Sequence, residues 1–250
     1  MSVRKGVYFV SDVHLGLAVK DPAEREARFV AFLKGIPSDT TLALYLLGDI
    51  WDFWYEYRDV VPKGYVRVFS ALTDLIDAGV KVYFFPGNHD IWCYSYFESL
   101  GIRVVREQPQ VLEMDGKVFC IGHGDGLGPG MRGYKFMNGV FKCRFVQRLF
   151  SALHPWLAFR LGEGWSRRSR LARNEEYEFK GGSEPLYKWA VEFSSRVRVD
   201  YFIFGHLHAQ VDEALPTGAR LLVMKDWMDQ SHFLYFDGIL TGSGHSMNTE

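Results

Sequence analysis

Five short clusters of acidic, amide and imidazole side chains punctuate the sequence, each directly after an apolar segment. They read Asp12-Val13-His14, Gly48-Asp49-Ile50-Trp51-Asp52, Gly87-Asn88-His89-Asp90, Gly122-His123-Gly124-Asp125 and Gly205-His206-Leu207-His208. One such cluster alone is more often a capped turn or a surface pair. Several in order, each at the end of a predicted strand, indicate a shared site, because the functional crevice of an open α/β sheet lies beyond the carboxyl ends of its strands.

Seven side chains in these clusters offer oxygen or nitrogen ligands, and none of them offers sulfur. They are the carboxylates of Asp12 and Asp49, the amide oxygen of Asn88, and the imidazoles of His14, His123, His206 and His208. This set is too large for one tetrahedral zinc ion. It suits two divalent first-row ions about 3.5–4 Å apart, with Mn²⁺ expected and iron, cobalt or zinc as alternatives. Two cations that close need an anion between them, and a shared carboxylate supplies one.

The apolar pattern predicts the elements that deliver these clusters. Strands are expected at Val7–Val10, Leu42–Leu47 and Val80–Phe85, separated by helices at Pro22–Ile36 and Tyr65–Ala78. Further strands are expected at Arg103–Val105, Val111–Met114, Val118–Ile121, Tyr201–Phe204, Leu221–Met224 and Phe233–Phe236. The front half thus alternates strand and helix, and the back half has consecutive strands, which together predict an α/β fold.

Composition and cysteine usage limit the class of protein. With 250 residues, 48% hydrophobic and 24% charged, the chain is neither disordered, collagenous nor a coiled coil. Cys93, Cys120 and Cys143 follow no paired spacing, which argues against a cysteine metal site and for a reducing compartment. The start has no signal-peptide core, and no apolar run approaches the length of a spanning helix. We therefore expect a soluble, cytoplasmic protein.

A basic block interrupts an otherwise acidic chain. Residues 126–173 contain ten Lys and Arg residues and one acid, Glu163, giving a net charge of +9, whereas the rest carries −10. Such a shift in composition marks an insertion. We expect a core made of residues 1–125 and 174–240, a helical lid at 126–173, named the insertion below, and a flexible tail at 241–250.

The insertion is apolar as well as basic. Helical spacing places one set of apolar residues on a broad arc and a second set opposite, so one side could pack on the body and the other could meet lipid. The first set is Met137, Val140, Phe141, Phe145 and Leu149, and the second is Phe136, Val146 and Phe150. His154-Pro155-Trp156 predicts a turn between two lid helices. The alternative is a lid with simple hydrophobic packing and a solvated basic rim.

The motifs D-x-H, G-D-x-x-D, G-N-H-D, G-H-G-D and G-H-x-H, in this order, resemble the calcineurin-like metallophosphoesterase superfamily. The resemblance implies a four-layer α/β/β/α sandwich with a two-metal site at one edge. It implies that Asp12, His14 and His208 hold the first metal. Asn88, His123 and His206 are then expected to hold the second, with Asp49 as the bridge.

The same resemblance implies a role for His89 as the acid that protonates the leaving oxygen. A carboxylate three residues beyond the bridging Asp supports this histidine in the wider superfamily, and Asp52 stands there. A neighbouring carboxylate favours the imidazolium and keeps its proton available near neutral pH. Simple loop hydrogen bonding is the alternative for both residues.

A narrower resemblance concerns the segment Gly48 to Trp54, the insertion after Asp125, and Gly133-Tyr134 within it. Together these look like the UDP-2,3-diacylglucosamine pyrophosphatases of lipid A biosynthesis. The resemblance implies hydrolysis of a UDP-diacylsugar to UMP and the diacylated sugar 1-phosphate, under a lid that receives the acyl chains. Well-known members have Arg at the place of His89 and Glu at that of Asp52, which leaves open a sister branch or a different phosphoester.

The end of the insertion, Trp165-Ser166-Arg167-Arg168-Ser169-Arg170, is rich in guanidinium and hydroxyl groups. Arg forks bind phosphate in a bidentate way, so we expect Arg168, Ser169 and Arg170, with Tyr134 and Asn88, to bind the substrate head group. A solvated helix end is the alternative. The positive charge also suits an anionic surface, and we expect peripheral association with the cytoplasmic face of the inner membrane.

Other functions compete with this interpretation. A metallophosphoesterase for a soluble nucleotide, such as a cyclic nucleotide or a dinucleoside polyphosphate, would not need Trp156, Phe159 and Trp165 beside an apolar helix. A nuclease could use the basic block to track phosphates, but the acidic body repels nucleic acid, so no nucleic-acid partner is expected. A non-catalytic scaffold is disfavoured because every ligand position is intact. The sequence does not set the oligomeric state.

Overall fold

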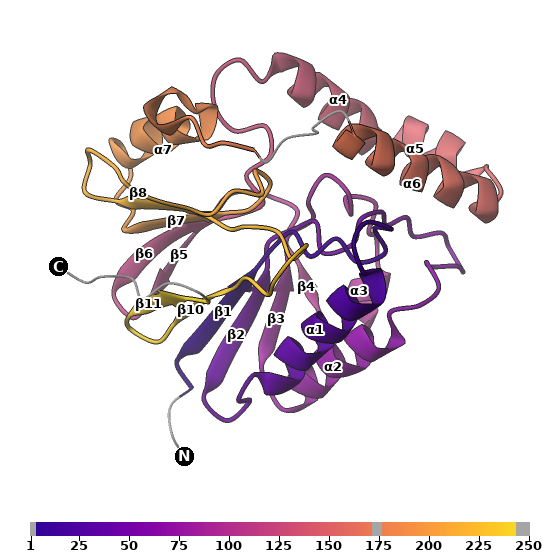
Figure 1. The fold of residues 1–250 in the computed structure, drawn as a ribbon, viewed down its shortest axis with the longest axis horizontal. Helices are drawn as coiled ribbons and strands as arrows, with labels where there is room; N and C mark the ends of the chain where they lie inside the picture. The colour runs from indigo at the N-terminus through magenta and orange to yellow at the C-terminus, as the bar shows by residue number, and fades with distance from the viewer. Residues whose placement is uncertain (1–3, 172–176, 244–250) are drawn as a thin grey trace.

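The computed structural model describes residues 4–171 and 177–243, without the side chains of residues 163 and 167–171. Its strands form two sheets that pack face to face, and helices cover the outer face of each sheet (Figure 1). This is the four-layer α/β/β/α sandwich that the sequence predicts.

The first sheet has the strand order β11-β10-β1-β2-β3-β4. Strands β1 to β4 run parallel, and β10 and β11 are antiparallel additions at one edge. The strands are β1 (Gly6–Val10), β2 (Thr41–Leu46), β3 (Lys81–Phe84), β4 (Arg103–Val104), β10 (Leu234–Phe236) and β11 (Leu240–Gly242). Helices α1 (Pro22–Gly35) and α2 (Val66–Asp77) connect the first three strands, as parallel pairing requires.

The second sheet has the order β5-β6-β7-β9-β8. Its three central strands β6, β7 and β9 are parallel, and the two edge strands are antiparallel to their neighbours. The strands are β5 (Gln110–Met114), β6 (Lys117–Ile121), β7 (Tyr201–Phe204), β8 (Val211–Ala214) and β9 (Arg220–Val223). Helix α7 (Pro185–Ser194) lies on its outer face (Figure 1).

Three apolar cores separate the four layers. Phe9 of β1 packs with Phe119 of β6 between the sheets, and the next residue, Val10, packs with Phe29 under α1. This alternation follows from the two-residue period of a strand, which sends successive side chains to opposite faces. A third core joins α7 to the outer face of the second sheet.

Some elements were not predicted from the sequence. They are α3 (Tyr96–Ser99), a 3₁₀ turn at Gly181–Ser183, α7, β8 and β11. Strand β8 exposes Asp212 and Glu213 at the sheet edge, where charged side chains are common and hide the apolar period. Strand β11 includes the first two residues of the segment expected to be a flexible tail.

The insertion contains three helices, α4 (Arg132–Lys142), α5 (Arg144–Ser151) and α6 (Pro155–Leu171). Residues 152–154 separate α5 from α6, so the turn expected at His154-Pro155-Trp156 exists but lies slightly earlier, and Pro155 and Trp156 already belong to α6. The expectation of one continuous helix before that turn is wrong. Cys143 is extended, with φ −68 and ψ 117, so α4 ends and α5 begins at this residue.

One side of the insertion packs on the loops that follow β2 and β3. The indole Nε1 of Trp92 donates a hydrogen bond to the carbonyl of Phe141 at 2.9 Å, and the hydroxyl of Tyr55 donates to the carbonyl of Gln147 at 3.0 Å. The rings of Phe53 and Phe159 meet edge to face, 6.0 Å apart. The insertion is therefore tied to the body through aromatic residues of the ligand-bearing loops.

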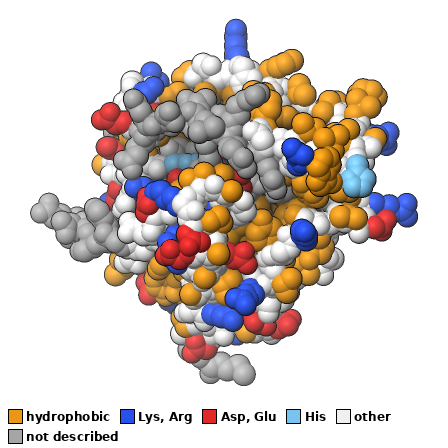
Figure 2. Space-filling model, turned by 45° about the vertical axis from the view of Figure 1, so that its right-hand side comes forward, with side chains coloured by type: hydrophobic (Ala, Val, Ile, Leu, Met, Phe, Trp, Pro, Cys, Tyr) orange, Lys and Arg blue, Asp and Glu red, His pale blue; other side chains and the backbone are white. Residues whose placement is uncertain are grey.

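The other side of the insertion exposes apolar residues to solvent. Phe136 is 76% exposed, Phe145 68%, and both Trp156 and Trp165 60%. Figure 2 shows hydrophobic side chains gathered on the side of the molecule that carries these helices, with Lys and Arg nearby. The insertion thus has two apolar sides. Because the helix breaks at Cys143, the residues on each side differ from those expected, and Phe136 lies on the exposed side. Among the described residues, no helix is long and apolar enough to cross a membrane.

Two glycines of α6 allow a matched test of the docking. A Cβ at Gly162 would lie 2.3 Å from the ring of Phe53, whereas a Cβ at Gly164 would meet nothing within 4 Å. Ala in place of a helical Gly stabilises by about 0.5–1 kcal/mol where there is room. We expect Gly164→Ala to slow tryptic cleavage of the insertion and Gly162→Ala to accelerate it. Equal cleavage rates in the two variants would contradict this mode of packing.

Candidate dinuclear metal site

The parallel strands of both sheets deliver polar side chains to a common edge of the sandwich. Three overlapping groups of carboxylates and imidazoles assemble there, and within each group the ligand atoms lie within 4.8 Å of one another. They are Asp12, His14, Asp49 and His208; Asp49, His123 and His206; and His14, Asp52 and His89. The convergence predicted for the five sequence clusters is confirmed.

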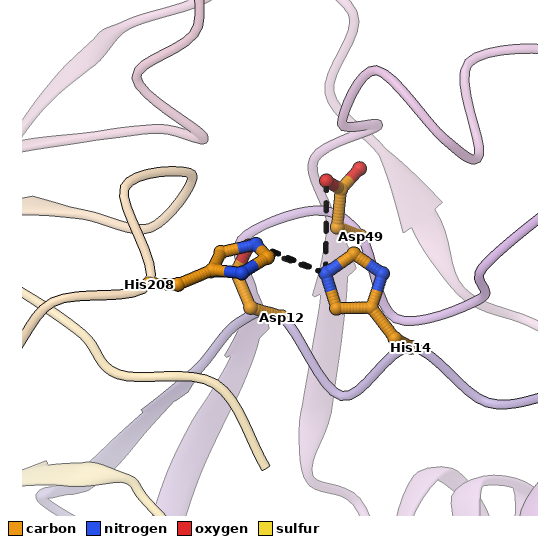
Figure 3. A group of neighbouring side chains, drawn as sticks. All are labelled: Asp12, His14, Asp49 and His208. Atoms are coloured by element: carbon orange, nitrogen blue, oxygen red, sulfur yellow. Dashed lines mark hydrogen bonds and ion pairs between the residues drawn. The ribbon is translucent and has the colours of Figure 1, made fainter. Parts of the chain in front are cut away.

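The first group surrounds a point between two imidazoles (Figure 3). The Nε2 atoms of His14 and His208 are 3.2 Å apart. One oxygen of Asp12 lies 3.2 Å from Nε2 of His208 and 3.7 Å from Nε2 of His14. Two neighbouring Nε2 atoms beside a carboxylate are a donor set that a cation fits, because all the ligand atoms lie within 4.8 Å of one another.

The second group lies on the other side of Asp49. Nε2 of His123 is 3.3 Å from Oδ2 of Asp49 and 3.3 Å from Oδ1 of Asn88. The ring of His206 meets that of His123 edge to face, with 5.1 Å between centroids. The same Oδ2 of Asp49 is 4.0 Å from Nε2 of His14, so this oxygen faces both groups.

The ligand loops hold an unusual backbone conformation. Asp12, His14, Asp49, His206 and His208 have φ between 50 and 68, and they are five of the eight non-glycine residues with positive φ in the described chain. Such residues cost of order 1–3 kcal/mol each and persist where surrounding contacts hold them. Here the N–H of His14 donates to the carbonyl of Asp49, and the N–H of His206 donates to the carboxylate of Asp12. The ligands thus hold one another's loops.

Two glycines leave room for the carboxylates. A Cβ at Gly87 would lie 2.2 Å from Oδ1 of Asp49, and a Cβ at Gly205 would lie 2.2 Å from Oδ2 of Asp12. Any other residue at either position would displace a ligand. The site is therefore built by backbone that approaches the carboxylates closely.

The carboxylates are held in their charged form. Burial by itself would raise the pKa of Asp12, but the neighbouring imidazoles of His14 and His208 outweigh it and hold that pKa well below the ordinary value. Burial is likewise outweighed for Asp49, whose pKa is lowered by the charge of His123. Both carboxylates therefore offer negative charge to a cation.

The histidines respond in opposite directions. Burial lowers the pKa of His206 to about 4. Burial also opposes protonation of His123 and His208, but Asp49 raises the pKa of His123 well above its usual value, and hydrogen bonding to Asp12 raises that of His208 to about 9. Metal ligation requires neutral imidazole, so a bound cation would take the place of these protons. The residues present fit a pair of divalent ions.

The structure places His89 beside the bridging carboxylate. Its backbone N–H donates to Oδ1 of Asp49 at 2.9 Å, and its ring Nδ1 lies 2.8 Å from the carbonyl oxygen of Asp52. The Asp52 carboxylate is nearer to Nδ1 of His14, at 3.3 Å, than to Nδ1 of His89, at 3.8 Å. Burial lowers the pKa of His89 more than Asp49 and Asp52 raise it, which is opposite to the direction expected from the sequence.

Tyr134 reaches the site from helix α4. Its hydroxyl donates to Asp125 at 3.1 Å, its ring centroid lies 5.7 Å from that of His206, and Asn138 of the same helix donates to the same Asp125 oxygen at 3.1 Å. Asp125 therefore ties α4 to the second group. The side chains of Arg168, Ser169 and Arg170, at the end of α6, lie outside the described residues.

Two carboxylates near the site, the buried Asp90 and the half-buried Asp226, had no role in the sequence interpretation. Asp226 lies in the loop after strand β9, and its Oδ2 lies 3.2 Å from Nδ1 of His208. Asp90 accepts hydrogen bonds from the backbone N–H groups of Gly87, Ile50 and two neighbours, at 2.7 to 3.3 Å, and so joins two ligand loops. The apolar run that ends at Met224 is followed by Lys225 and then Asp226, so Asp226 shows only a weaker form of the signal that identified the other clusters.

Comparison with known proteins extends these observations. The family model of the calcineurin-like phosphoesterases matches residues 6–210. A UDP-2,3-diacylglucosamine hydrolase of Porphyromonas gingivalis is 36% identical over 253 residues, covering 94% of this chain and 95% of that protein. Proteins of the same name from Klebsiella pneumoniae and Stenotrophomonas maltophilia are 29% and 28% identical, covering 80% and 92% of this chain and 80% and 94% of their own lengths. Matches of this extent confirm the resemblance seen in the motifs, and the chain belongs to the calcineurin-like phosphoesterases, a family of metal-dependent hydrolases.

Proposed function

We propose that this chain hydrolyses the pyrophosphate of UDP-2,3-diacylglucosamine to UMP and 2,3-diacylglucosamine 1-phosphate. The observation that carries the proposal is the position of the insertion. One side of it exposes apolar side chains, and the other side packs on the loops that carry the buried Asp and His residues. Tyr134 lies at the junction, beside both Asp125 and His206. The relatives of that name support the same substrate.

In this proposal two divalent ions occupy the site, with Mn²⁺ the expected metal. Asp12, His14 and His208 hold the first ion, and Asn88, His123 and His206 hold the second. The distances to Asp49 support its role as the bridge, since its Oδ2 faces His14 on one side and His123 on the other. When bound, such ions withdraw charge from the scissile phosphate and lower the pKa of a water molecule.

His89 is proposed to protonate the leaving oxygen, with Asp52 as its support. The carbonyl of Asp52 can only accept a hydrogen bond, so Nδ1 of His89 carries a proton and Nε2 is the atom that gains and loses the transferred proton. That Nε2 is 4.0 Å from Asp49 and therefore faces the reacting centre. An anionic substrate raises the pKa of a nearby imidazole, which offsets the lowering caused by burial.

The insertion is proposed as the element that selects the substrate. Tyr134, Arg168, Ser169 and Arg170, together with Asn88, bind the head group, while exposed apolar side chains receive the acyl chains. A surface that combines such side chains with a net charge of +9 also suits the anionic face of a bilayer, and peripheral association with the cytoplasmic side of the inner membrane is part of the proposal.

Replacement of the bridging carboxylate tests the metal site. We expect Asp49→Ala to lose both ions and essentially all activity, because neither group is complete without this residue. Cys120→Ala, a buried change between β6 and its neighbours, is the control and should keep both. Metal analysis of the purified variants decides the matter, and two tightly bound ions in Asp49→Ala would exclude the bridge.

Removal of His89 tests the proton transfer. We expect His89→Ala to slow turnover by about 10²- to 10⁴-fold with unchanged metal content. The loss should shrink for esters whose leaving group has a low pKa, because such groups depart without a proton. Turnover of a nitrophenyl ester and of the acylated substrate supplies the comparison. An equal loss for both would mean that His89 positions the substrate instead.

A double variant tests the insertion. Arg168→Ala with Arg170→Ala should raise KM for the acylated substrate at least about tenfold, since one lost charged contact costs about 1.5–3 kcal/mol. Hydrolysis of a small ester should be nearly unchanged. Arg196→Ala with Arg198→Ala makes the same charge change outside the insertion and should affect neither substrate. If both substrates or neither responds to the Arg168/Arg170 pair, a soluble nucleotide becomes the favoured substrate.

A further inference from the structure

Nδ1 of three of the four proposed ligand histidines lies close to an oxygen atom, and the kind of oxygen differs between the two groups. Nδ1 of His14 lies 3.3 Å from the carboxylate of Asp52, and Nδ1 of His208 lies 3.2 Å from the carboxylate of Asp226. Nδ1 of His123 instead lies 2.9 Å from the carbonyl oxygen of Leu47. Both imidazoles of the first group are therefore backed by an acid, and His123 of the second group is backed by a neutral oxygen.

Asp226 is fixed in place by the loop that follows β9. Its second carboxylate oxygen accepts a hydrogen bond from the N–H of Met228 at 3.2 Å. The N–H of the intervening Trp227 donates to the carbonyl of Asp12 at 3.1 Å, and the Trp227 side chain is fully buried. The Asp226 side chain is only 14% exposed. The loop thus holds this carboxylate against His208, although the strand before it, β9, supplies no metal ligand.

We propose that Asp226 is a positioning residue for the metal ion held by Asp12, His14 and His208, and that Asp226 and Asp52 make this the tighter of the two metal positions. The inference rests on the proposed assignment of ligands to two ions. It concerns residues behind the ligands, and it predicts that the two positions fill in order.

The physical reason lies in what each acceptor does to its imidazole. A carboxylate or a carbonyl at Nδ1 keeps the proton there and leaves the Nε2 lone pair for the metal. A carboxylate also makes the imidazole a stronger donor and adds negative charge close to the cation, which a neutral carbonyl does not. The gain therefore falls on His14 and His208 and is absent at His123.

The charges around the two positions differ in the same sense. Asp49 is shared, and the first position adds Asp12 as a direct ligand and the two supporting acids. The second position adds the uncharged Asn88. Asp125 also acts on this side, but its oxygen accepts hydrogen bonds from Tyr134 and Asn138 of the insertion. Divalent cations are held more tightly where more carboxylate charge converges.

Substitution of Asp226 by Asn separates this role from simple bracing of the loop. An amide oxygen can still accept the hydrogen bond of Met228, so Asp226→Asn keeps the brace and removes the charge. Asp229→Asn, an exposed carboxylate on the same loop, is the matched control. Metal-free samples of the full-length protein are titrated with Mn²⁺, and the free ion is followed by electron paramagnetic resonance.

The wild-type protein and Asp229→Asn should bind two Mn²⁺ ions with distinct affinities. In Asp226→Asn the tighter class should weaken by about 10- to 100-fold while the weaker class stays unchanged. The melting temperature of the metal-free variant should equal that of the wild type, and ¹⁵N spectra should show a changed Nδ1 environment at His208.

The opposite results overturn the inference. If the tighter class is unaltered, or both classes weaken alike, Asp226 does not distinguish the positions. If the metal-free variant melts at a lower temperature and its Mn²⁺ affinities are those of the wild type, the residue only braces the loop. Two bound ions of equal affinity in the wild type overturn the inference alone, whereas fewer than two bound ions also overturn the proposed two-metal site.

Discussion

Negative charge confined to a small buried volume is the constraint on which the site depends. Asp12 and Asp49 are almost fully buried, and the ion pairs that join them to described residues are all with histidines. Buried charges without partners are costly, so either protons or cations must compensate them. The fold meets this condition by bringing imidazoles to the carboxylates from both sheets. The two sheets, their parallel strands and the glycine turns can be understood as means to hold that balance of charge.

Much of this arrangement could be predicted from the sequence because it is local. The parallel strands β1, β2, β3, β6 and β7 are apolar runs that end in polar clusters, and the predicted strand at Tyr201–Phe204 agrees with β7 residue for residue. Features that depend on partners far along the chain were not predicted. The contact between Asp226 and His208 needs the pairing of β7 with β9, and the extended residue Cys143 has no Gly or Pro to mark the break between two helices. The carboxylate of Asp52 faces His14 more closely than the histidine it was expected to support, because loop geometry, not spacing, sets that choice.

The insertion is a separate helical segment that lies at the same edge of the sandwich as the ligands. It enters the chain directly after the cluster of His123 and leaves before α7, so neither sheet is interrupted. Its contacts with the body include those of Phe53, Tyr55 and Trp92, which lie on the loops that also carry Asp49 and Asn88. Any shift of the insertion is therefore felt first by the ligand loops. The residues proposed for the reaction and those proposed for substrate selection thus lie in different segments of the sequence but next to each other in the structure.

The left-handed backbone of the ligand residues has a consequence for the evolutionary history of such a site. At a positive φ the residues tolerated best are Gly, Asn, Asp and, less often, His. Replacement of His206 or His208 by Gly relieves backbone strain and removes a metal ligand. Loss of the ions and relief of that strain therefore occur in one step. A lineage that no longer needs hydrolysis can therefore shed its chemistry and retain the sandwich. In this sense the fold can persist after its hydrolytic activity is lost.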